Sequence, residues 1–193
     1  MKLLLQPLPV RIFHWIMAAT ISYLVLTGLY LHDPWGILPY GVMRKTHTIA
    51  GIILVLNLLG QVYYYLATGK YTELLFTLHD FPNLRSFFRY ALFITENHPN
   101  YGRYNPGQKA IFTSWGLVTL LAGIAALPYF FPAYASYLSR PFGGLGGIRI
   151  VFYSIAMFFL ATIPLHVYLV FTEDPAKLQA MFSGYIKKEP KVK

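Results

Sequence analysis

Four long stretches without a charged side chain constrain this chain more than any other feature. They contain 20, 21, 22 and 23 residues with no Lys, Arg, Asp or Glu, and they run over Ile12–Leu31, His47–Ala67, Ala110–Phe131 and Ile150–Thr172. At about 1.5 Å per residue, each would span about 30 Å as a helix, which is the thickness of a bilayer core. Because lipid offers the backbone no hydrogen-bond partners, such segments must be helical. We therefore expect an all-α fold, a four-helix transmembrane bundle that forms one membrane-embedded domain over residues 1–193.

The composition agrees with a membrane protein and limits its redox chemistry. Of the 193 residues, 56% are hydrophobic and 12% are charged, whereas soluble domains carry about 25% charged residues. The chain has no cysteine, which excludes an iron–sulfur cluster, a thiolate zinc site, a covalently attached c-type haem and a cysteine nucleophile. Any redox cofactor must be held through other ligands, and any iron–sulfur cluster that serves this chain must belong to another subunit.

The positive charges are distributed unevenly between the two sides of the predicted bundle. Twelve of the 16 Lys and Arg residues lie in the N-terminal segment, the loop over 68–109 and the C-terminal tail, and four lie in the other two loops. The positive-inside rule therefore predicts a multi-pass protein of the cell inner membrane with both termini and the long loop in the cytoplasm. Within that loop, Asn83–Leu92 has a basic amphipathic pattern and is expected to form a short helix on the inner membrane surface. We expect no nucleic-acid partner, because no basic stripe with interleaved aromatic residues lies on a soluble element.

Two of the six histidines lie at similar depth in different spans. His14 is about one turn into the first span from its cytoplasmic end, and His166 is about two turns before the cytoplasmic end of the fourth. Such a pair can hold one metal between two helices, and without cysteine the natural candidate is haem iron with two histidine ligands. Zinc is disfavoured because only two strong ligands converge. The alternative for each imidazole is a hydrogen bond to a backbone carbonyl. His47 lies near the outer end of span two, where the other spans offer no histidine partner.

Four motifs in the expected order carry a family resemblance. Arg11-Ile-Phe-His14-Trp15 opens the first span and Arg44-Lys-Thr-His47 opens the second. Tyr104-Asn105-Pro106-Gly107-Gln108-Lys109 precedes the third, and His166-Val-Tyr168, followed by the run 180–185, is expected at the end of the fourth. Together they resemble the bacterial cytochrome b561 family, which includes the cytochrome b subunits of nickel–iron hydrogenases and the gamma subunits of formate dehydrogenases.

The resemblance implies b haem ligated by His14 and His166 near the cytoplasmic side. In the family a second haem joins the span-two histidine to one in span four, 14 residues before the last. That position is Phe152 here, so His47 has no evident partner, about 21 Å along the helix from the pair. We therefore expect one haem and a packing role for His47. The alternative is an outer haem held by an unusual ligand.

The resemblance also implies a quinone site beside the inner haem. Asn105 and Gly107 map onto residues that contact the quinone in formate dehydrogenase gamma subunits, with Gln108 and Lys109 nearby. A quinone needs donors to its carbonyls, which Asn105 can supply, and Gly107 permits a close backbone approach. The compatible structural reading is a turn before span three, with Lys109 snorkelling.

These expectations combine into one function and two alternatives. We expect an integral-membrane haem-b subunit that passes electrons between an iron–sulfur partner and menaquinone or ubiquinone, and that is not a catalyst alone. Because loss of the outer haem would break electron transfer from outside, the iron–sulfur and catalytic subunits are expected to dock on the cytoplasmic face. The main alternative is a redox-inactive membrane anchor for soluble catalytic subunits. A transporter is disfavoured because no acidic residue lies in a span.

Overall fold

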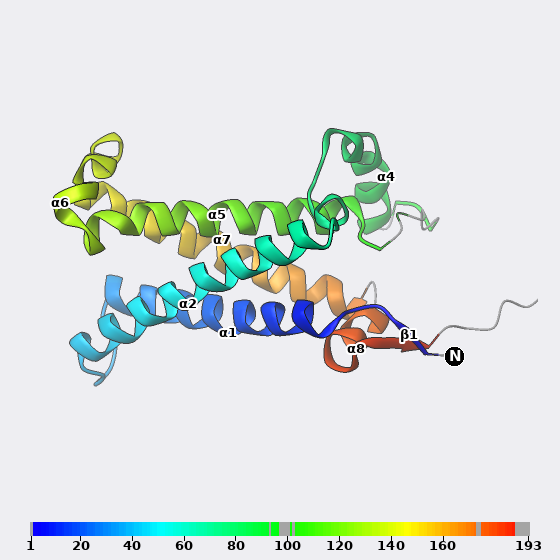
Figure 1. The fold of residues 1–193 in the computed structure, drawn as a ribbon, viewed down its shortest axis with the longest axis horizontal. Coiled ribbons are helices and arrows are strands. Elements are labelled where there is room, and N and C mark those ends of the chain that lie inside the picture. Colours follow the sequence, from blue (N-terminus) through cyan, green and yellow to red (C-terminus); the bar gives the residue numbers. More distant parts are fainter. Residues whose placement is uncertain (1, 93, 97–100, 102, 173–174, 188–193) are drawn as a thin grey trace, which may run out of the picture.

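The computed structural model describes residues 2–92, 94–96, 101, 103–172 and 175–187, and four long helices dominate it (Figure 1). They are α1 (Leu8–His32), α2 (Tyr40–Ala67), α5 (Pro106–Phe130) and α7 (Leu145–Thr172). Each is long and apolar enough to cross a membrane, with mean hydropathy between 1.6 and 2.0. The prediction of four membrane-crossing helices is confirmed by length and composition.

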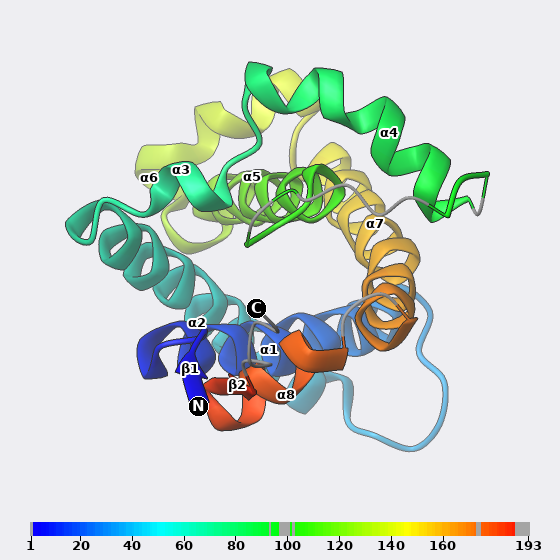
Figure 2. The same ribbon diagram turned by 90° about the vertical axis from the view of Figure 1, so that its right-hand side faces the viewer.

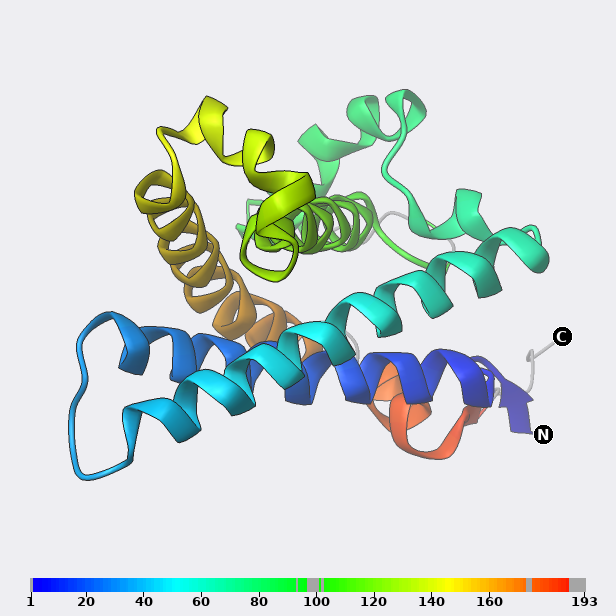
Figure 3. The ribbon, with the colours of Figure 1, turned by 60° about the vertical axis from the view of Figure 1, so that its left-hand side comes forward.

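The four helices form a ring in which neighbours run antiparallel. α1 packs against α2 and α7, and α5 packs against the same two helices, an arrangement that Figure 2 shows along the bundle. The α1–α2 and α5–α7 connections lie at the same end of the bundle, on the left in Figure 1 and turned towards the viewer in Figure 3, and we call it the far end. The opposite end holds residues 2–7, the segment between α2 and α5, and residues 175–187, and we call it the terminal end.

A small apolar core lies inside the ring and much of the apolar surface faces outward. The buried core residues are contributed by α1, α2 and α7, and are Ile21, Val25, Leu54 and Phe159. By contrast, Leu26, Leu56 and Leu117 are each more than 60% exposed on the helix exteriors. Outward leucines of this kind suit lipid tails, which are as apolar as the side chains themselves.

All four helices begin earlier than the charge-free runs predicted. They start at residues 8, 40, 106 and 145, where the runs started at 12, 47, 110 and 150. The additional turns contain the charged residues Arg11, Arg44, Lys45, Lys109 and Arg149. A charge ends an apolar run but does not end a helix, because a long basic side chain at a helix terminus can reach the polar interface.

The segment between α2 and α5 contains three short helices at the terminal end. These are α3 (Tyr71–Leu74), the 3-10 helix η1 (Leu78–Asp80) and α4 (Phe81–Ala91). The short helix that was predicted over Asn83–Leu92 is therefore present and begins two residues earlier. At the far end, α6 (Pro132–Ala135) and the 3-10 helix η2 (Ser136–Phe142) form the connection between α5 and α7.

A two-stranded sheet that sequence reasoning missed joins the two ends of the chain. β1 (Lys2–Leu4) pairs antiparallel with β2 (Tyr185–Lys187), so that Leu3 lies opposite Ile186. α8 (Pro175–Ser183) leads into β2 through Gly184, whose φ of +85° is a conformation that glycine adopts without strain. The run 180–185 therefore lies in α8, Gly184 and the first residue of β2, and not at the end of span four. The lysines at 188, 191 and 193 are outside the described residues.

Candidate functional site

His14 and His166 lie next to each other across the α1–α7 contact at the terminal end. Their ring centres are 6.5 Å apart and the ring planes are inclined by 52°. Two metal–nitrogen bonds of about 2.0 Å, each followed by about 1.1 Å to the ring centre, would separate the centres by about 6.2 Å. The two imidazoles, predicted from their depths to lie close together, are thus separated by about the distance that two ligands of one metal ion require.

Both imidazoles have unused ligand capacity. The Nδ1 atom of His14 is buried without a hydrogen-bond partner, and none of the hydrogen bonds found among the described residues involves His166. A buried ring nitrogen is normally hydrogen-bonded, so the backbone-carbonyl alternative has no support for His14. Across the described residues, no three His, Cys, Asp or Glu side chains gather as a metal-binding group. A metal held here would thus need further ligands from a macrocycle, and the pair fits the axial ligation of haem iron.

Aromatic side chains hold the two imidazoles in place. On α5, Trp115 and Phe112 lie edge-on to the His166 ring at 5.3 and 6.5 Å. The Trp115 Nε1–H donates to Thr162 Oγ1 of α7 at 2.9 Å, which fixes the indole between the two helices. Trp15 packs edge-on against His14 at 5.0 Å.

Below the pair, α8 closes the terminal end of the bundle. The Trp15 Nε1–H donates to the Met181 carbonyl at 3.1 Å, and its ring lies 4.8 Å from that of Phe182. Arg11, one turn before His14, donates to the carbonyls of Met181 and Phe182. These bonds satisfy carbonyls that the end of a helix leaves unpaired, and they tie the last helix of the chain to the first.

His47 has a hydrogen-bonded partner of its own on α1. Its Nδ1 lies 2.8 Å from Thr27 Oγ1, and Thr27 is 5% exposed. The imidazole lies close to the α1 backbone, because a Cβ at Gly28 would be in ordinary contact with His47 Cε1 at 3.4 Å. Phe152, at the position that the resemblance assigns to a second ligand, packs against Tyr129 at 6.3 Å. Within the described part of the chain, no ring contact joins His47 to another histidine, and the number of haems stays a prediction.

The remaining histidines do not join the pair. His32, at the end of α1, is exposed and stacks on Tyr153 at 4.6 Å. His79 is exposed in η1, and His98 lies outside the described residues.

The Asn105–Lys109 motif caps the third span. Asn105 Oδ1 accepts from the Gln108 backbone N–H at 2.8 Å, and Gln108 Oε1 accepts from the Asn105 N–H at 3.1 Å. This reciprocal capping box supplies two of the partners that the start of a helix lacks. The close approach that Gly107 permits is made by Phe87 of α4, whose ring occupies the space where a Cβ would lie.

Lys109 forms an ion pair instead of extending into solvent. Its Nζ lies 2.9 Å from Asp80 Oδ1, while Asp80 Oδ2 accepts from the backbone N–H and hydroxyl of Thr77 at 2.8 and 2.9 Å. Burial alone would raise the pKa of Asp80, but the hydrogen bonds from Lys109 and Thr77 outweigh it and hold that pKa below its ordinary value. At the start of the span the ammonium group of Lys109 therefore meets a carboxylate that the loop brings to it, which is compatible with a snorkelling side chain.

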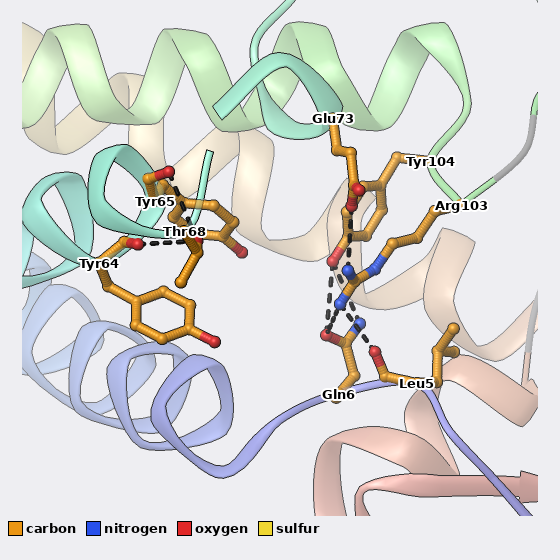
Figure 4. A network of polar contacts seen from close by, with 8 residues as sticks. All are labelled: Leu5, Gln6, Tyr64, Tyr65, Thr68, Glu73, Arg103 and Tyr104. Carbon is orange, nitrogen blue, oxygen red and sulfur yellow. Dashed lines mark hydrogen bonds and ion pairs between the residues drawn. The ribbon is translucent and has the colours of Figure 1, made fainter. Parts of the chain in front are cut away.

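Sequence reasoning missed a polar cluster around Arg103 that joins three segments (Figure 4). The guanidinium donates to Glu73 Oε2 at 3.0 Å, to the Leu5 carbonyl at 2.7 Å and to Gln6 Oε1 at 2.8 Å. Gln6 is 3% exposed, and its Nε2 donates to the Tyr104 hydroxyl at 3.2 Å. No local motif predicts these bonds, because their partners are separated by between 30 and 98 residues in the sequence.

The cluster is linked to the histidine pair through aromatic rings. Tyr104 packs edge-on against Phe112 at 5.4 Å, and Phe112 in turn lies edge-on to His166. Two aromatic side chains, Tyr104 and Phe112, thus connect the start of α5 to the His166 imidazole on α7.

Comparison with known proteins agrees with this geometry. The sequence model of the family described as Prokaryotic cytochrome b561 matches residues 5–184. Relatives named "Probable Ni/Fe-hydrogenase B-type cytochrome subunit" are known from Azotobacter vinelandii and Cupriavidus necator. Each is 26% identical to this chain, over 92% of this chain and 84% of the relative. A protein of the same name from Azotobacter chroococcum is 25% identical with the same coverage. The chain therefore belongs to the prokaryotic cytochrome b561 family, and it is a multi-pass membrane subunit that transfers electrons through haem b.

Proposed function

We propose that this chain carries electrons between an iron–sulfur partner subunit and a membrane quinone, with haem b held between His14 and His166. The observation that carries the proposal is the facing pair of imidazoles at 6.5 Å on the first and last spans. The unpaired Nδ1 of His14 supports it, because burying a polar atom without a partner costs free energy that a ligand would recover.

The chain's own residues would hold and orient the cofactor. Haem iron supplies reversible one-electron oxidation and reduction. His14 and His166 would bind the iron through their imidazoles, and Trp115, held by its hydrogen bond to Thr162, would fix the orientation of the His166 ring. We propose one haem per chain, because Phe152 offers no ligand opposite His47.

A quinone site at the start of α5 is the second part of the proposal. The oxygen atoms of Asn105 and Gln108 serve the helix cap, which leaves their amide N–H groups as donors to a quinone carbonyl. Lys109 and Asp80 lie beside them as an ion pair. Reduction of a quinone places charge on its carbonyl oxygens, so hydrogen-bond donors at this position suit either menaquinone or ubiquinone.

The partner is proposed to be a hydrogenase-type catalytic subunit together with an iron–sulfur subunit. The support is the name of the relatives, Ni/Fe-hydrogenase B-type cytochrome subunits, and the absence of cysteine, which requires that clusters come from another chain. We propose docking at the terminal end, on the cytoplasmic side of the cell inner membrane. That end carries the histidine pair and most of the positive charge.

Haem content tests the proposal directly. His14→Ala and His166→Ala should each remove the b-type absorbance band, whereas His32→Ala and His79→Ala should keep it. A pyridine haemochrome assay should give one haem per chain in the wild type. A chain that purifies with its catalytic partners but without haem would instead be the redox-inactive anchor. Two haems per chain would overturn the assignment of His47.

The quinone and the partner need a separate measurement on the haem-loaded complex. Asn105→Ala should slow reoxidation of dithionite-reduced haem by added quinone and leave the absorbance band unchanged. Crosslinking should join the partner subunits to the segment over 68–109. Crosslinks confined to the far end would contradict docking on the cytoplasmic side.

A further inference from the structure

α4 has two apolar sides, and only one of them packs on the protein. Phe87 is 6% exposed, with Leu84 and Ala91 partly buried beside it. On the other side, Phe81 and Phe88 are 56% and 55% exposed, and Leu92, which directly follows the helix, is 65% exposed. The exposed apolar area needs an explanation, because large side chains in one row rarely face water together.

The three exposed residues form a single stripe that arginines border on one side. At about 100° per residue, Phe81, Phe88 and Leu92 fall within about 40° of one another around the helix axis. Arg85 and Arg89 follow at about 40° and 80° from Phe81, and both are exposed. The segment Phe81–Ala91 contains no acidic residue, so the two guanidinium groups have no counter-charge on their own helix.

The position of α4 relative to the spans indicates what the stripe faces. Phe87 occupies the space beside Gly107 in the first turn of α5, so α4 lies at the level where the spans end. Figure 2 shows α4 running along the outside of the ring, beside α5 and towards α7, across the direction of the spans. A helix at this level and on this side of the bundle adjoins the lipid headgroups.

We propose that α4 binds anionic lipid, with Phe81, Phe88 and Leu92 among the acyl chains and Arg85 and Arg89 on the headgroup phosphates. Guanidinium groups bind phosphate oxygens through paired charge-assisted hydrogen bonds. An apolar stripe bordered by basic residues is the pattern of a helix that lies in the membrane interface. The proposal does not depend on haem or quinone. It fixes the terminal end of the bundle at the anionic surface of the membrane.

Depth measurements with a spin label test the orientation of the stripe. Since the chain has no cysteine, Leu92→Cys and Asn83→Cys each provide one labelling site, on opposite sides of α4. In vesicles of phosphatidylcholine and phosphatidylglycerol, the label at 92 should collide mainly with oxygen, which dissolves in acyl chains, and the label at 83 mainly with a water-soluble nickel chelate. Equal nickel accessibility at both sites would overturn the proposal. The proposal would also be overturned if the label at 92 collided mainly with the nickel chelate in vesicles and became inaccessible to it only when partner subunits bind, because that result identifies a protein interface.

A matched pair of charge variants tests the arginines. Arg85→Gln with Arg89→Gln removes two charges from α4, and Arg44→Gln with Lys45→Gln removes two exposed charges from the far end. Each basic side chain near an anionic surface contributes about fivefold to binding. The first variant should therefore bind phosphatidylglycerol about thirtyfold more weakly in native mass spectrometry, and the second should bind it as the wild type does. An equal loss in both variants would contradict a site on α4.

Discussion

The contact between α4 and the start of α5 can be tested by adding one methyl group. In Gly107→Ala, the new Cβ would lie well inside 3.0 Å of Phe87 Cε1 and Cζ, closer than real Cβ atoms come to any neighbour. The ring is 6% exposed, so it cannot move aside without leaving its packing. Overpacking of this kind costs about 1–3 kcal/mol, and the better helix propensity of alanine returns about 0.5–1 kcal/mol. We expect a net loss of about 1–2 kcal/mol in the free energy of unfolding.

Gly116 provides a matched control in the same helix. A Cβ at Gly116 would have no neighbour within 4 Å, so Gly116→Ala should leave stability unchanged or raise it by about 0.5–1 kcal/mol. Unfolding by sodium dodecyl sulfate in mixed micelles, followed by circular dichroism, measures both variants. In thermal unfolding, each 1 kcal/mol corresponds to about 2–4 °C for a chain of this size.

A double variant identifies the ring as the cause. Leucine lacks the outer ring atoms, so Phe87→Leu should relieve the clash with the new Cβ in Gly107→Ala. The double variant should therefore lose about 1 kcal/mol less in the free energy of unfolding than the two single variants lose together. Strict additivity, or equal stability of the two alanine variants at 107 and 116, would refute the packing of α4 on α5.

Three further predictions concern the site and its supports. Trp115→Phe removes the hydrogen bond to Thr162, which should cost about 1 kcal/mol and change the EPR g-values of the ferric haem; unchanged g-values would argue against a positioning role. Because the pKa of Asp80 lies below its ordinary value of 3.8, the ionised carboxylate beside Lys109 stabilises the fold above that pH, and this contribution is lost as the pH falls through the folded-state pKa. Unfolding measured against pH should therefore show the wild type and Asp80→Asn converging in acid, and a gap that persists there would contradict the ion pair. Gly184→Ala places a side chain at positive φ, at a cost of about 1–2 kcal/mol, and should speed amide hydrogen exchange in β1 and β2, while unaffected exchange would show that the turn tolerates alanine.

The spans and the histidine pair could be predicted because both depend on local sequence and simple counting. A run without charge must be helical in lipid, and depth within a helix follows from residue number at a fixed rise. His14 and His166 were therefore brought together without any knowledge of packing. The predicted helix starts are too late because a charge-free run stops at the nearest charged residue, such as Arg11 or Lys109, whereas the helix continues through it.

The supports of the site could not be predicted, because they depend on contacts between distant segments. Arg103 bonds to the Leu5 carbonyl across 98 residues, and nothing around either residue marks the partner. Three-residue strands such as β1 are too short to show an alternating pattern. One signal was readable, since Asn105 with Gln108 three residues later is the spacing of a capping box. That spacing predicts the helix cap, and it also predicts that the side-chain oxygens of Asn105 and Gln108 are used in the cap and do not bind a ligand.

The β1–β2 pairing and the bonds from Arg11 to α8 join segments that are far apart in the sequence. The order in which these segments are synthesised therefore affects when the site can form. The two facing imidazoles lie on α1 and α7, the first and the fourth spans to leave the ribosome. A nascent chain that has inserted two or three spans holds only one of them. If haem lies between them as proposed, its stable loading must wait until α7 has been inserted, and a product that stops before α7 cannot retain it.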